Sequence, residues 1–244
     1  MGLMFWSLNN QWQGQSDAAV DYTGRWKLLQ HATARYFAPM LLHLHSGWDT
    51  TPNTGWNDTN ITAGIINDTP HTGVATVTMT LRSWATGDPL HAWHSTGTLP
   101  AYSSHNFTKA RKAELLGNHT AASVFLIASA TLDTPKNEEE RSEEEAVALP
   151  QAHHYFTKMK VAELHDPKIT LVFGGVFGEN LTVTVACKAP APHVFLDPGV
   201  LLGHFDDNGI LLLPSTSRTL IFDTMGALHG ATAVLFACDA CVVS

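Results

Sequence analysis

Trp6, Asn9 and Trp12 lie close together near the start of the chain, and their side chains are of the types that bind sugars. An indole ring can stack on the apolar face of a hexose, and an amide group exchanges hydrogen bonds with hydroxyl groups. The chain holds seven tryptophans, a generous number for 244 residues. The alternative interpretation is structural: Trp6 packs in a core, and Trp12 only fixes its loop.

Histidine and cysteine side chains are candidates for metal binding. Fourteen histidines are present, and His43 and His45 are two residues apart. None, however, has the companion ligands and spacing of a zinc site. Cys238-Asp-Ala-Cys241 is a single C-x-x-C motif, and Cys187 is distant from it in the sequence. Because a zinc site of this type needs a second such pair, we predict no metal site and no cofactor.

Six Asn-x-Ser/Thr motifs are acceptors for N-linked glycans if the chain passes through the secretory route. They begin at Asn57, Asn60, Asn67, Asn106, Asn118 and Asn180. This is more than a threonine-rich chain of this size usually gives by chance. The alternative interpretation is that the motifs are incidental features of threonine-rich loops.

Overall composition excludes several classes of function. The formal net charge is −8 at pH 7, with no basic stripe, so we predict no nucleic-acid partner, because phosphates require clustered Lys and Arg. No run of about eighteen apolar residues occurs, and we expect no membrane span. Met1 does not open a charged and then apolar signal segment. Glycan motifs are used only in chains that enter the secretory route, which requires a signal peptide. We therefore expect that an N-terminal part carrying the signal peptide is missing from this sequence.

The first 38 residues have the pattern of one strand, a long loop and one helix. Residues 2–6 form a short apolar run, typical of a strand buried on both faces of a parallel sheet. Four residues at helical spacing predict a helix that begins at Gly24 and ends before Pro39: Trp26, Leu29, Thr33 and Phe37. Such a unit cannot close a sheet alone, because its strand exposes unpaired hydrogen-bonding edges.

The rest of the chain has the two-residue periodicity of β-strands. Val77, Met79 and Leu81 alternate with polar residues, which predicts a half-buried antiparallel strand. Further strands are predicted within residues 90–99, 123–130, 169–173, 181–185, 194–196, 210–213 and 219–222. Short strands separated by turns are typical of β-sandwiches. We predict one sandwich over residues 39–133, an acidic linker over 134–146, a second sandwich over 147–224 and a divergent tail over 225–244.

Three sequence blocks resemble the lysosomal-type β-mannosidases, which are retaining glycoside hydrolases. The first block runs from Trp6 to Lys27, where the family typically reads W-Q-L-N-D-x-W-Q and then E-Y-G-G-R-W-K. The second is Arg35-Tyr-Phe-Ala-Pro39. The third joins Phe195-Leu-Asp-Pro-Gly199 to Gly203-His-Phe-Asp-Asp-Asn-Gly209. The three blocks occur in the same order as in the family and extend over the chain as far as about Phe222. A single short motif could not cover so much of the chain.

The resemblance implies a mainly β chain with two immunoglobulin-like β-sandwiches, preceded by the last strand and helix of a truncated (β/α)8 barrel over residues 1–38. It implies a parent enzyme of the lysosome that removes terminal β-D-mannose from oligosaccharides and glycoproteins. In that enzyme the Trp6 side chain would form the floor of the sugar pocket, at the end of the last barrel strand. Asn9 would bond a sugar hydroxyl, and Trp12 would line the outer pocket. The partner would be a mannose-terminated oligosaccharide.

Retaining hydrolysis requires two carboxyl groups about 5–5.5 Å apart with separated pKa values. In the family both are glutamates on earlier barrel strands, which the resemblance places upstream of residue 1. The N-terminal region offers only Asp17 and Asp21, and Asp21 is better placed to interact with the positive end of the predicted helix. We therefore assign no catalytic residue and expect the chain alone to be inactive. Ser7, Asn10 and Asp17 also differ from the family, which usually has Gln, Asp and Trp there.

The competing hypothesis belongs to a different class of function. Residues 40–224 would form a non-catalytic, secreted, immunoglobulin-like module that binds a glycan or a protein through its loops. The coding sequence upstream of residue 1 would discriminate between the two: barrel strands favour the enzyme, and a signal exon favours the binding module.

Overall fold

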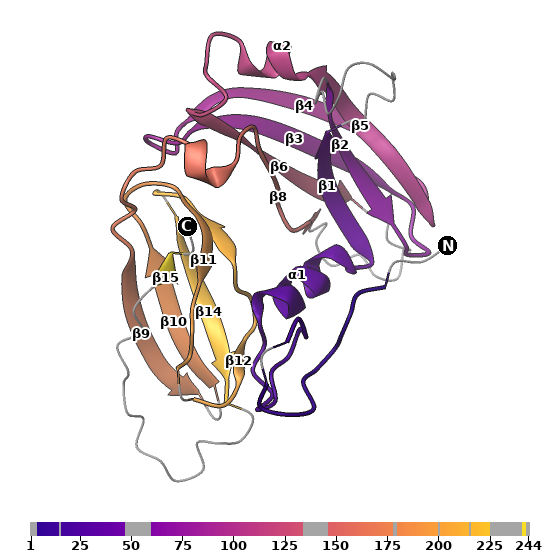
Figure 1. Ribbon diagram of the computed structural model, residues 1–244. Coiled ribbons are helices and arrows are strands. Elements are labelled where there is room, and N and C mark those ends of the chain that lie inside the picture. The colour runs from indigo at the N-terminus through magenta and orange to yellow at the C-terminus, as the bar shows by residue number, and fades with distance from the viewer. Residues whose placement is uncertain are drawn as a thin grey trace. The chain divides into compact units, whose positions relative to one another are not determined.

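The computed structural model describes residues 4–14, 16–46, 60–133, 146–177, 180–199, 201–214, 216–224 and 241–242 (Figure 1). β-Strands are the predominant regular structure of the described residues. These residues also include three short helical segments: α1 (Leu28–Tyr36), α2 (Lys112–Leu116) and the 3-10 helix η2 (Met159–Val161). Within these ranges, no helix is both long and apolar enough to cross a membrane.

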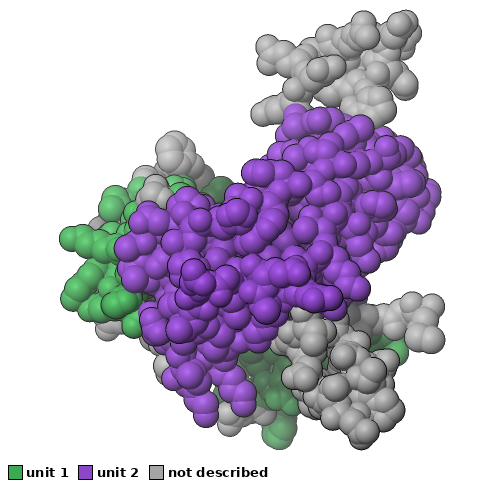
Figure 2. All heavy atoms as spheres, turned by 90° about the horizontal axis from the view of Figure 1, so that it is seen from above, with its two compact units in different colours: residues 1–36, 164–244 green, residues 37–163 purple. Residues whose placement is uncertain are grey.

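The chain folds as two compact units, which Figure 2 shows in different colours. We call residues 37–163 the central unit. Residues 1–36 and 164–244 form the other, which we call the terminal unit. The N-terminal segment is therefore part of the same unit as the second sandwich, although more than a hundred residues separate them in the sequence.

A five-stranded antiparallel sheet is built around β3 (Gly73–Ser83) in the central unit. On one side of β3 lies β4 (Pro89–Leu99), and on the other lies β6 (Val124–Asp133). β7 (Val147–Ala148) and β8 (Ala152–Tyr155) both pair with β6. This differs from the predicted boundary at residue 147: β7 and β8 belong to the first sandwich, because their backbone groups complete the free edge of β6.

The central unit also contains a three-stranded antiparallel sheet with the order β1-β2-β5. Its strands are β1 (Met40–Ser46), β2 (Asn60–Asn67) and β5 (Ser103–Arg111). The sequence periodicity predicted none of the three, since β2 is buried almost throughout and β5 is largely polar. Side chains of both sheets form one core, whose largest fully buried members include Ile61, Ile65, Met79, Leu81, Leu99, Leu126 and Leu132.

The terminal unit contains a second pair of sheets. One has the order β12-β14-β10-β9, with β12 (His204–Phe205), β14 (Ser217–Asp223), β10 (Asn180–Ala186) and β9 (Thr170–Phe177). The other has the order β13-β11-β15, with β13 (Ile210–Leu212), β11 (Ala191–Phe195) and β15 (Cys241–Val242). The alternating residues predicted for this sandwich form its core: Val183, Val185, Val194, Ile210, Leu212, Leu220 and Phe222.

Two predictions at the ends of the sequence differ from the structure. The predicted tail supplies β15, which pairs with β11 of the second sandwich. At the other end, the described residues 4–6 of the predicted buried strand form no strand, and Trp6 is 87% exposed. The physical reason is that a strand of a parallel sheet needs a neighbour to accept its backbone hydrogen bonds.

The helix of the N-terminal segment is shorter than predicted, and it buries a different face. It begins at Leu28 rather than Gly24, because a tight turn precedes it, in which the Asp21 amide donates to the Arg25 carbonyl and Lys27 donates to Ala19. Leu29 of the predicted apolar stripe is 36% exposed, whereas His31 is buried. Contacts with the second sandwich decide which face is covered.

Candidate functional site

The N-terminal segment is attached to the second sandwich through one arginine of α1. The Arg35 guanidinium lies 2.6 Å from the Asp207 carboxylate and donates to the carbonyl oxygens of Asn208 and Gly209. Arg218 of β14 contacts the other Asp207 oxygen at 3.1 Å. Hydrogen bonds to a charged partner are stronger than neutral ones. The guanidinium of Arg35 therefore fixes the last turn of α1 on the loop before β13.

Asn208 holds that loop in place from inside. Its side chain is buried, and its Oδ1 accepts hydrogen bonds from the amides of Leu196 at 2.7 Å and Gly209 at 3.0 Å. Its Nδ2 donates to the Leu196 carbonyl at 2.8 Å. The two halves of the third sequence block, 195–199 and 203–209, are joined by this one amide group.

Glycine is required at two positions of the same block. Gly203 has φ +137° and Gly209 has φ +62°, values that favour residues without a Cβ. A Cβ at Gly203 would collide with the Asp223 carbonyl, and a Cβ at Gly209 would collide with the Leu28 side chain of α1. The close approach of α1 to the loop therefore depends on Gly209.

An aromatic cluster lies under this attachment. Trp26 stacks on His204 with ring centroids 4.0 Å apart and an interplanar angle of 16°, and it meets His31 edge-on at 5.4 Å. His31 in turn meets Phe195 edge-on at 6.4 Å. Burial lowers the pKa of His31 to about 4, so the ring is neutral at neutral pH. Trp26 itself precedes α1 and is partly buried.

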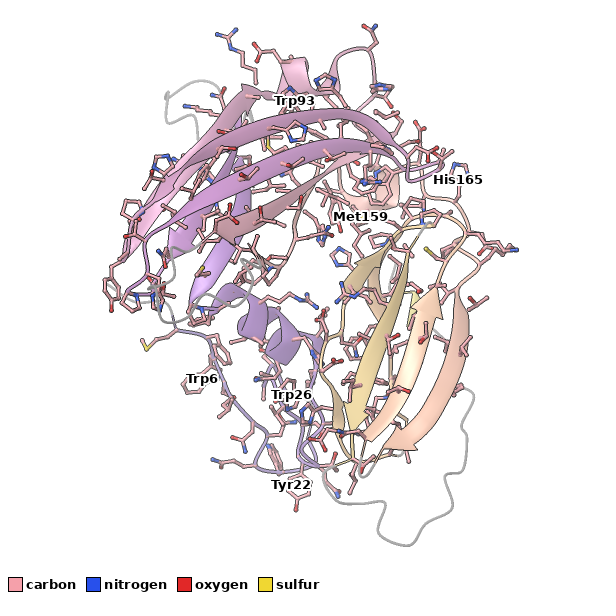
Figure 3. The ribbon with its side chains drawn as sticks, turned by 180° about the vertical axis from the view of Figure 1, so that it is seen from behind. Trp6, Tyr22, Trp26, Trp93, Met159 and His165 are labelled. Atoms are coloured by element: carbon pink, nitrogen blue, oxygen red, sulfur yellow. The ribbon has the colours of Figure 1, made fainter. Side chains whose placement is uncertain are left out.

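The three predicted sugar-binding residues of the N-terminal segment are exposed. Trp6 is 87% exposed and Trp12 is 73% exposed. Asn9 is also exposed, and its Nδ2 donates to the Asn10 carbonyl at 3.5 Å. Figure 3 shows Trp6 and Tyr22 projecting outward from this segment. The three side chains come from one segment of the chain, residues 6–12.

Asp21 is occupied by local contacts and is not a free carboxylate. It accepts hydrogen bonds from the amides of Thr23 and Arg25 at 2.8 and 3.0 Å, and the Arg25 Nε lies 2.8 Å away. Burial opposes ionisation of this carboxyl group, but the hydrogen bonds from Thr23 and Arg25 outweigh it and lower the pKa. A general acid needs a raised pKa, so Asp21 stabilises the turn before α1 and does not serve that role.

The glycan motifs differ in accessibility. Asn106, Asn118 and Asn180 are exposed, and Asn60 is partly exposed. Asn67 is fully buried: its Nδ2 donates to the carbonyls of His71 and Pro100, and its Oδ1 accepts from Thr69. Glycosylation of Asn67 stays a prediction, and the enclosure of its amide nitrogen in the folded chain argues against it. Asn57 lies outside the described residues.

Cysteine and acidic side chains offer no evident metal centre in the described ranges. No group of three or more His, Cys, Asp or Glu side chains there is placed to hold an ion. Cys187 is buried, and burial raises the pKa of its thiol. Cys238 lies outside the described residues.

Sequence reasoning did not assign a role to Arg35, His204 or Asn208. All three are inside the blocks that carry the family resemblance, so the blocks were the available signal. Their partners could not be read from the sequence, because Arg35 and Asp207 are 172 residues apart. We interpret the attachment as a structural site that positions the N-terminal segment.

Two family models match the chain. A mannosidase Ig/CBM-like domain matches residues 59–160, and an Ig-fold domain of mannosidases matches residues 164–234. The second match extends beyond Phe222, where the resemblance was predicted to end. These matches confirm the mainly β class and the two immunoglobulin-like domains.

Curated relatives are similar over most of the chain. The β-mannosidase of Mus musculus is 26% identical over 228 residues, and β-mannosidase A of Aspergillus clavatus is 26% identical over 229 residues. In both cases the alignment covers 91% of this chain and 23% of the relative. The chain thus spans about a quarter of the length of the curated relatives that it matches.

Solved structures share the fold. The β-D-mannosidase of Dictyoglomus thermophilum superposes with a TM-score of 0.65 at 15% identity, over 89% of this chain and 23% of that one. The exo-chitosanase of Amycolatopsis orientalis gives a TM-score of 0.58 at 15% identity, over 91% and 28% respectively.

The fold and the family models define the class first: the chain carries two mannosidase-type immunoglobulin-like domains. The relatives then give the particular resemblance. Over 91% of its length the chain is similar to β-mannosidases, at 26% identity to the mouse enzyme.

Proposed function

We propose that the chain is the C-terminal part of a β-mannosidase that hydrolyses terminal β-D-mannose residues of oligosaccharides and glycoproteins. The observation that carries this proposal is the continuous similarity to β-mannosidases over 91% of the chain, with both domain models in order. The relatives' names supply the substrate class. Their mammalian members and the exposed glycan motifs support a protein that follows the secretory route to the lysosome.

In this proposal residues 1–38 are the last strand and helix of the catalytic barrel. The exposed apolar side chains of the segment support this role, since water-exposed groups of this size usually mark a surface that another part covers. They include Met4, Trp6, Leu8, Trp12 and Tyr22. Within a complete barrel, Trp6 would floor the sugar pocket, Asn9 would bond a hydroxyl group and Trp12 would line the outer pocket.

The role of the terminal unit is to hold that last barrel helix in position. Arg35, Trp26 and Gly209 attach α1 and the preceding turn to the second sandwich. Misplacing a sugar-binding side chain by about 1 Å can lower turnover about a hundredfold. A rigid attachment of α1 therefore contributes to activity without touching the substrate.

The chain by itself would lack hydrolytic activity. Retaining hydrolysis needs a nucleophile and a separate general acid. In the N-terminal segment Asp21 is ion-paired with a lowered pKa, and Asp17 is exposed on the loop. The catalytic pair would come from the three-quarters of the relatives that this chain does not span.

Two preparations test the proposal: the purified chain, and a chimera in which the chain replaces the matching C-terminal quarter of mouse β-mannosidase. We expect no hydrolysis of an aryl β-D-mannoside by the chain at acid pH. We expect the chimera to hydrolyse the β-mannoside in preference to an aryl β-D-glucosaminide. The second substrate is included because the fold is shared with an exo-chitosanase.

A matched pair of variants links the activity to the predicted pocket. Trp6→Ala in the chimera should lower turnover at least tenfold, whereas Tyr102→Ala, at an exposed aromatic of the central unit, should leave it unchanged. Turnover by the rigorously purified chain alone would refute its predicted inactivity. A folded but inactive chimera, together with glycan binding by residues 40–224, would instead favour the non-catalytic binding module.

A further inference from the structure

His43 and His45 lie side by side on one face of the three-stranded sheet. Alternate residues of a strand point to the same face, and both belong to β1. Their Nδ1 atoms are 3.2 Å apart, and their ring centroids are 5.1 Å apart with a tilt of 36°. The proposed function uses neither residue.

The neighbouring strands hold the His43 ring in this position. Gly64 of β2 is the register partner of His43, and Asn106 of β5 is the register partner of Gly64. A Cβ at Gly64 would stand 2.7 Å from His43 Nε2 and equally close to Asn106 Oδ1. The missing side chain of Gly64 therefore makes room for the imidazole to lie over β2, so the ring is placed before any ligand binds.

The spacing of the two nitrogen atoms fits a single metal ion. Two ligands 3.2 Å apart can each lie about 2.0–2.1 Å from one ion, with an N–metal–N angle of about 100°. This angle lies between the square-planar and tetrahedral values, which suit Cu²⁺ and Zn²⁺ respectively. Imidazole is a preferred ligand of both ions and a poor one for Mg²⁺ or Ca²⁺.

The surroundings of the His43 ring favour its neutral form. Burial lowers the pKa of His43, and the neighbouring His45 lowers it further. A histidine binds metal as the neutral imidazole. The rival explanation is a hydrogen bond between the two Nδ1 atoms, one protonated and the other not. The two explanations make opposite predictions when a metal ion is added.

We propose that His43 and His45 form an open two-histidine site for a divalent transition-metal ion, which binds Cu²⁺ more tightly than Zn²⁺. The protein supplies two ligands, and water or an external ligand completes the coordination sphere. The order of affinity follows the general preference of nitrogen sites for Cu²⁺. This site was not predicted from the sequence, because the His-x-His spacing alone does not show that the two rings converge.

Titration of the full chain, without a histidine tag, with CuCl₂ tests the site by calorimetry and by electron paramagnetic resonance. We expect one Cu²⁺ signal with coupling to two imidazole nitrogens. His43→Ala and His45→Gln should each weaken Cu²⁺ binding at least tenfold and remove the two-nitrogen coupling. The matched control is His94→Ala on the other sheet, an exposed histidine whose Nδ1 bonds Thr78 Oγ1 at 3.0 Å. It should change the affinity less than twofold.

The outcome is decisive even if one variant is poorly folded. His43 packs over β2, so thermal unfolding of His43→Ala is measured first, and His45→Gln at an exposed position carries the test if that variant unfolds. A loss smaller than tenfold in the folded variants, an equal loss in His94→Ala, or a Cu²⁺ spectrum without two-nitrogen coupling would overturn the proposal. None of these measurements depends on mannosidase activity.

Discussion

The buried side-chain amide of Asn208 joins residues 195–199 to residues 203–209, the loop before β13. Its removal tests how much one buried amide contributes to stability. Asn208→Ala would leave the amide and carbonyl of Leu196 without their partner. We expect a loss of about 2–4 kcal/mol in the free energy of unfolding, because buried polar groups without partners are costly. Urea denaturation measures it. The exposed control Asn118→Ala should change stability by less than about 0.5 kcal/mol, and equal losses would contradict the assignment.

His31 makes the stability of the terminal unit depend on pH. Its pKa is about 4 in the folded state against 6.5 as the ordinary value, so the unfolded chain takes up a proton first as pH falls. The stabilisation that comes from burying the neutral His31 ring is fully present above pH 6.5. It is lost as the pH falls towards 4, and the free energy of unfolding then decreases by about 3 kcal/mol at most. His31→Phe should abolish this part of the pH dependence in denaturation at pH 7 and pH 4.5. An unchanged pH dependence in this variant would show that another group is responsible.

Asn67 shows how burial restricts modification. In protein secreted from a eukaryotic host, we expect Asn67 to remain unmodified, because a glycan cannot be accommodated where the amide bonds His71 and Pro100. The exposed Asn106, Asn118 and Asn180 serve as internal controls that accept glycans. Peptide mass spectrometry after enzymatic deglycosylation measures occupancy at each site. Folded protein that carries a glycan on Asn67 would contradict the burial of this side chain.

At the scale of elements, the packing of α1 on the loop before β13 depends on a glycine. Gly209 and Gly199 have nearly equal φ angles, +62° and +63°, so alanine at either position carries a backbone strain of about 1–2 kcal/mol. At Gly209 the new Cβ would also collide with Leu28 of α1, whereas at Gly199 it would meet no atom of the described residues within 4 Å, apart from the residues adjacent in the chain.

We therefore expect Gly209→Ala to be clearly more destabilising than Gly199→Ala in urea denaturation. The double variant Gly209→Ala with Leu28→Ala should recover part of the difference, since it removes the colliding side chain. Equal effects of the two glycine substitutions would show that α1 does not press against this loop.

At the scale of the whole molecule, the terminal unit combines both ends of the sequence. Removal of residues 1–36 takes away the partners of His204, Asp207 and Gly209. We expect faster hydrogen exchange in β11, β12 and β13, with β3 and β6 of the central unit unchanged. Mass spectrometry of peptic fragments measures both regions in one sample. A uniform increase, or none, would contradict the division into these two units.

Much of the fold could be predicted from residue patterns. Strands such as β3 and β10 alternate apolar and polar residues because one face is buried and the other meets solvent. β2 could not be predicted in this way, because it is buried on both faces. β7 and β8 are too short to show a period, and their pairing with β6 is a non-local choice. For the candidate site, the residue types of Trp6, Asn9 and Trp12 indicated a sugar-binding role. The sequence did not indicate which residues they contact.

The sequence alone determined the class of the chain, its two sandwiches and its resemblance to the β-mannosidases, because these follow from local periodicity and from short blocks of residue identity. Only the tertiary structure decided that the N-terminal segment belongs to the second sandwich, that Asn67 is enclosed, and that His43 and His45 converge over Gly64. Each of these depends on contacts between residues distant in the sequence. Burial and the distance between two side chains are properties of the packed molecule, and a pattern along one strand does not specify them.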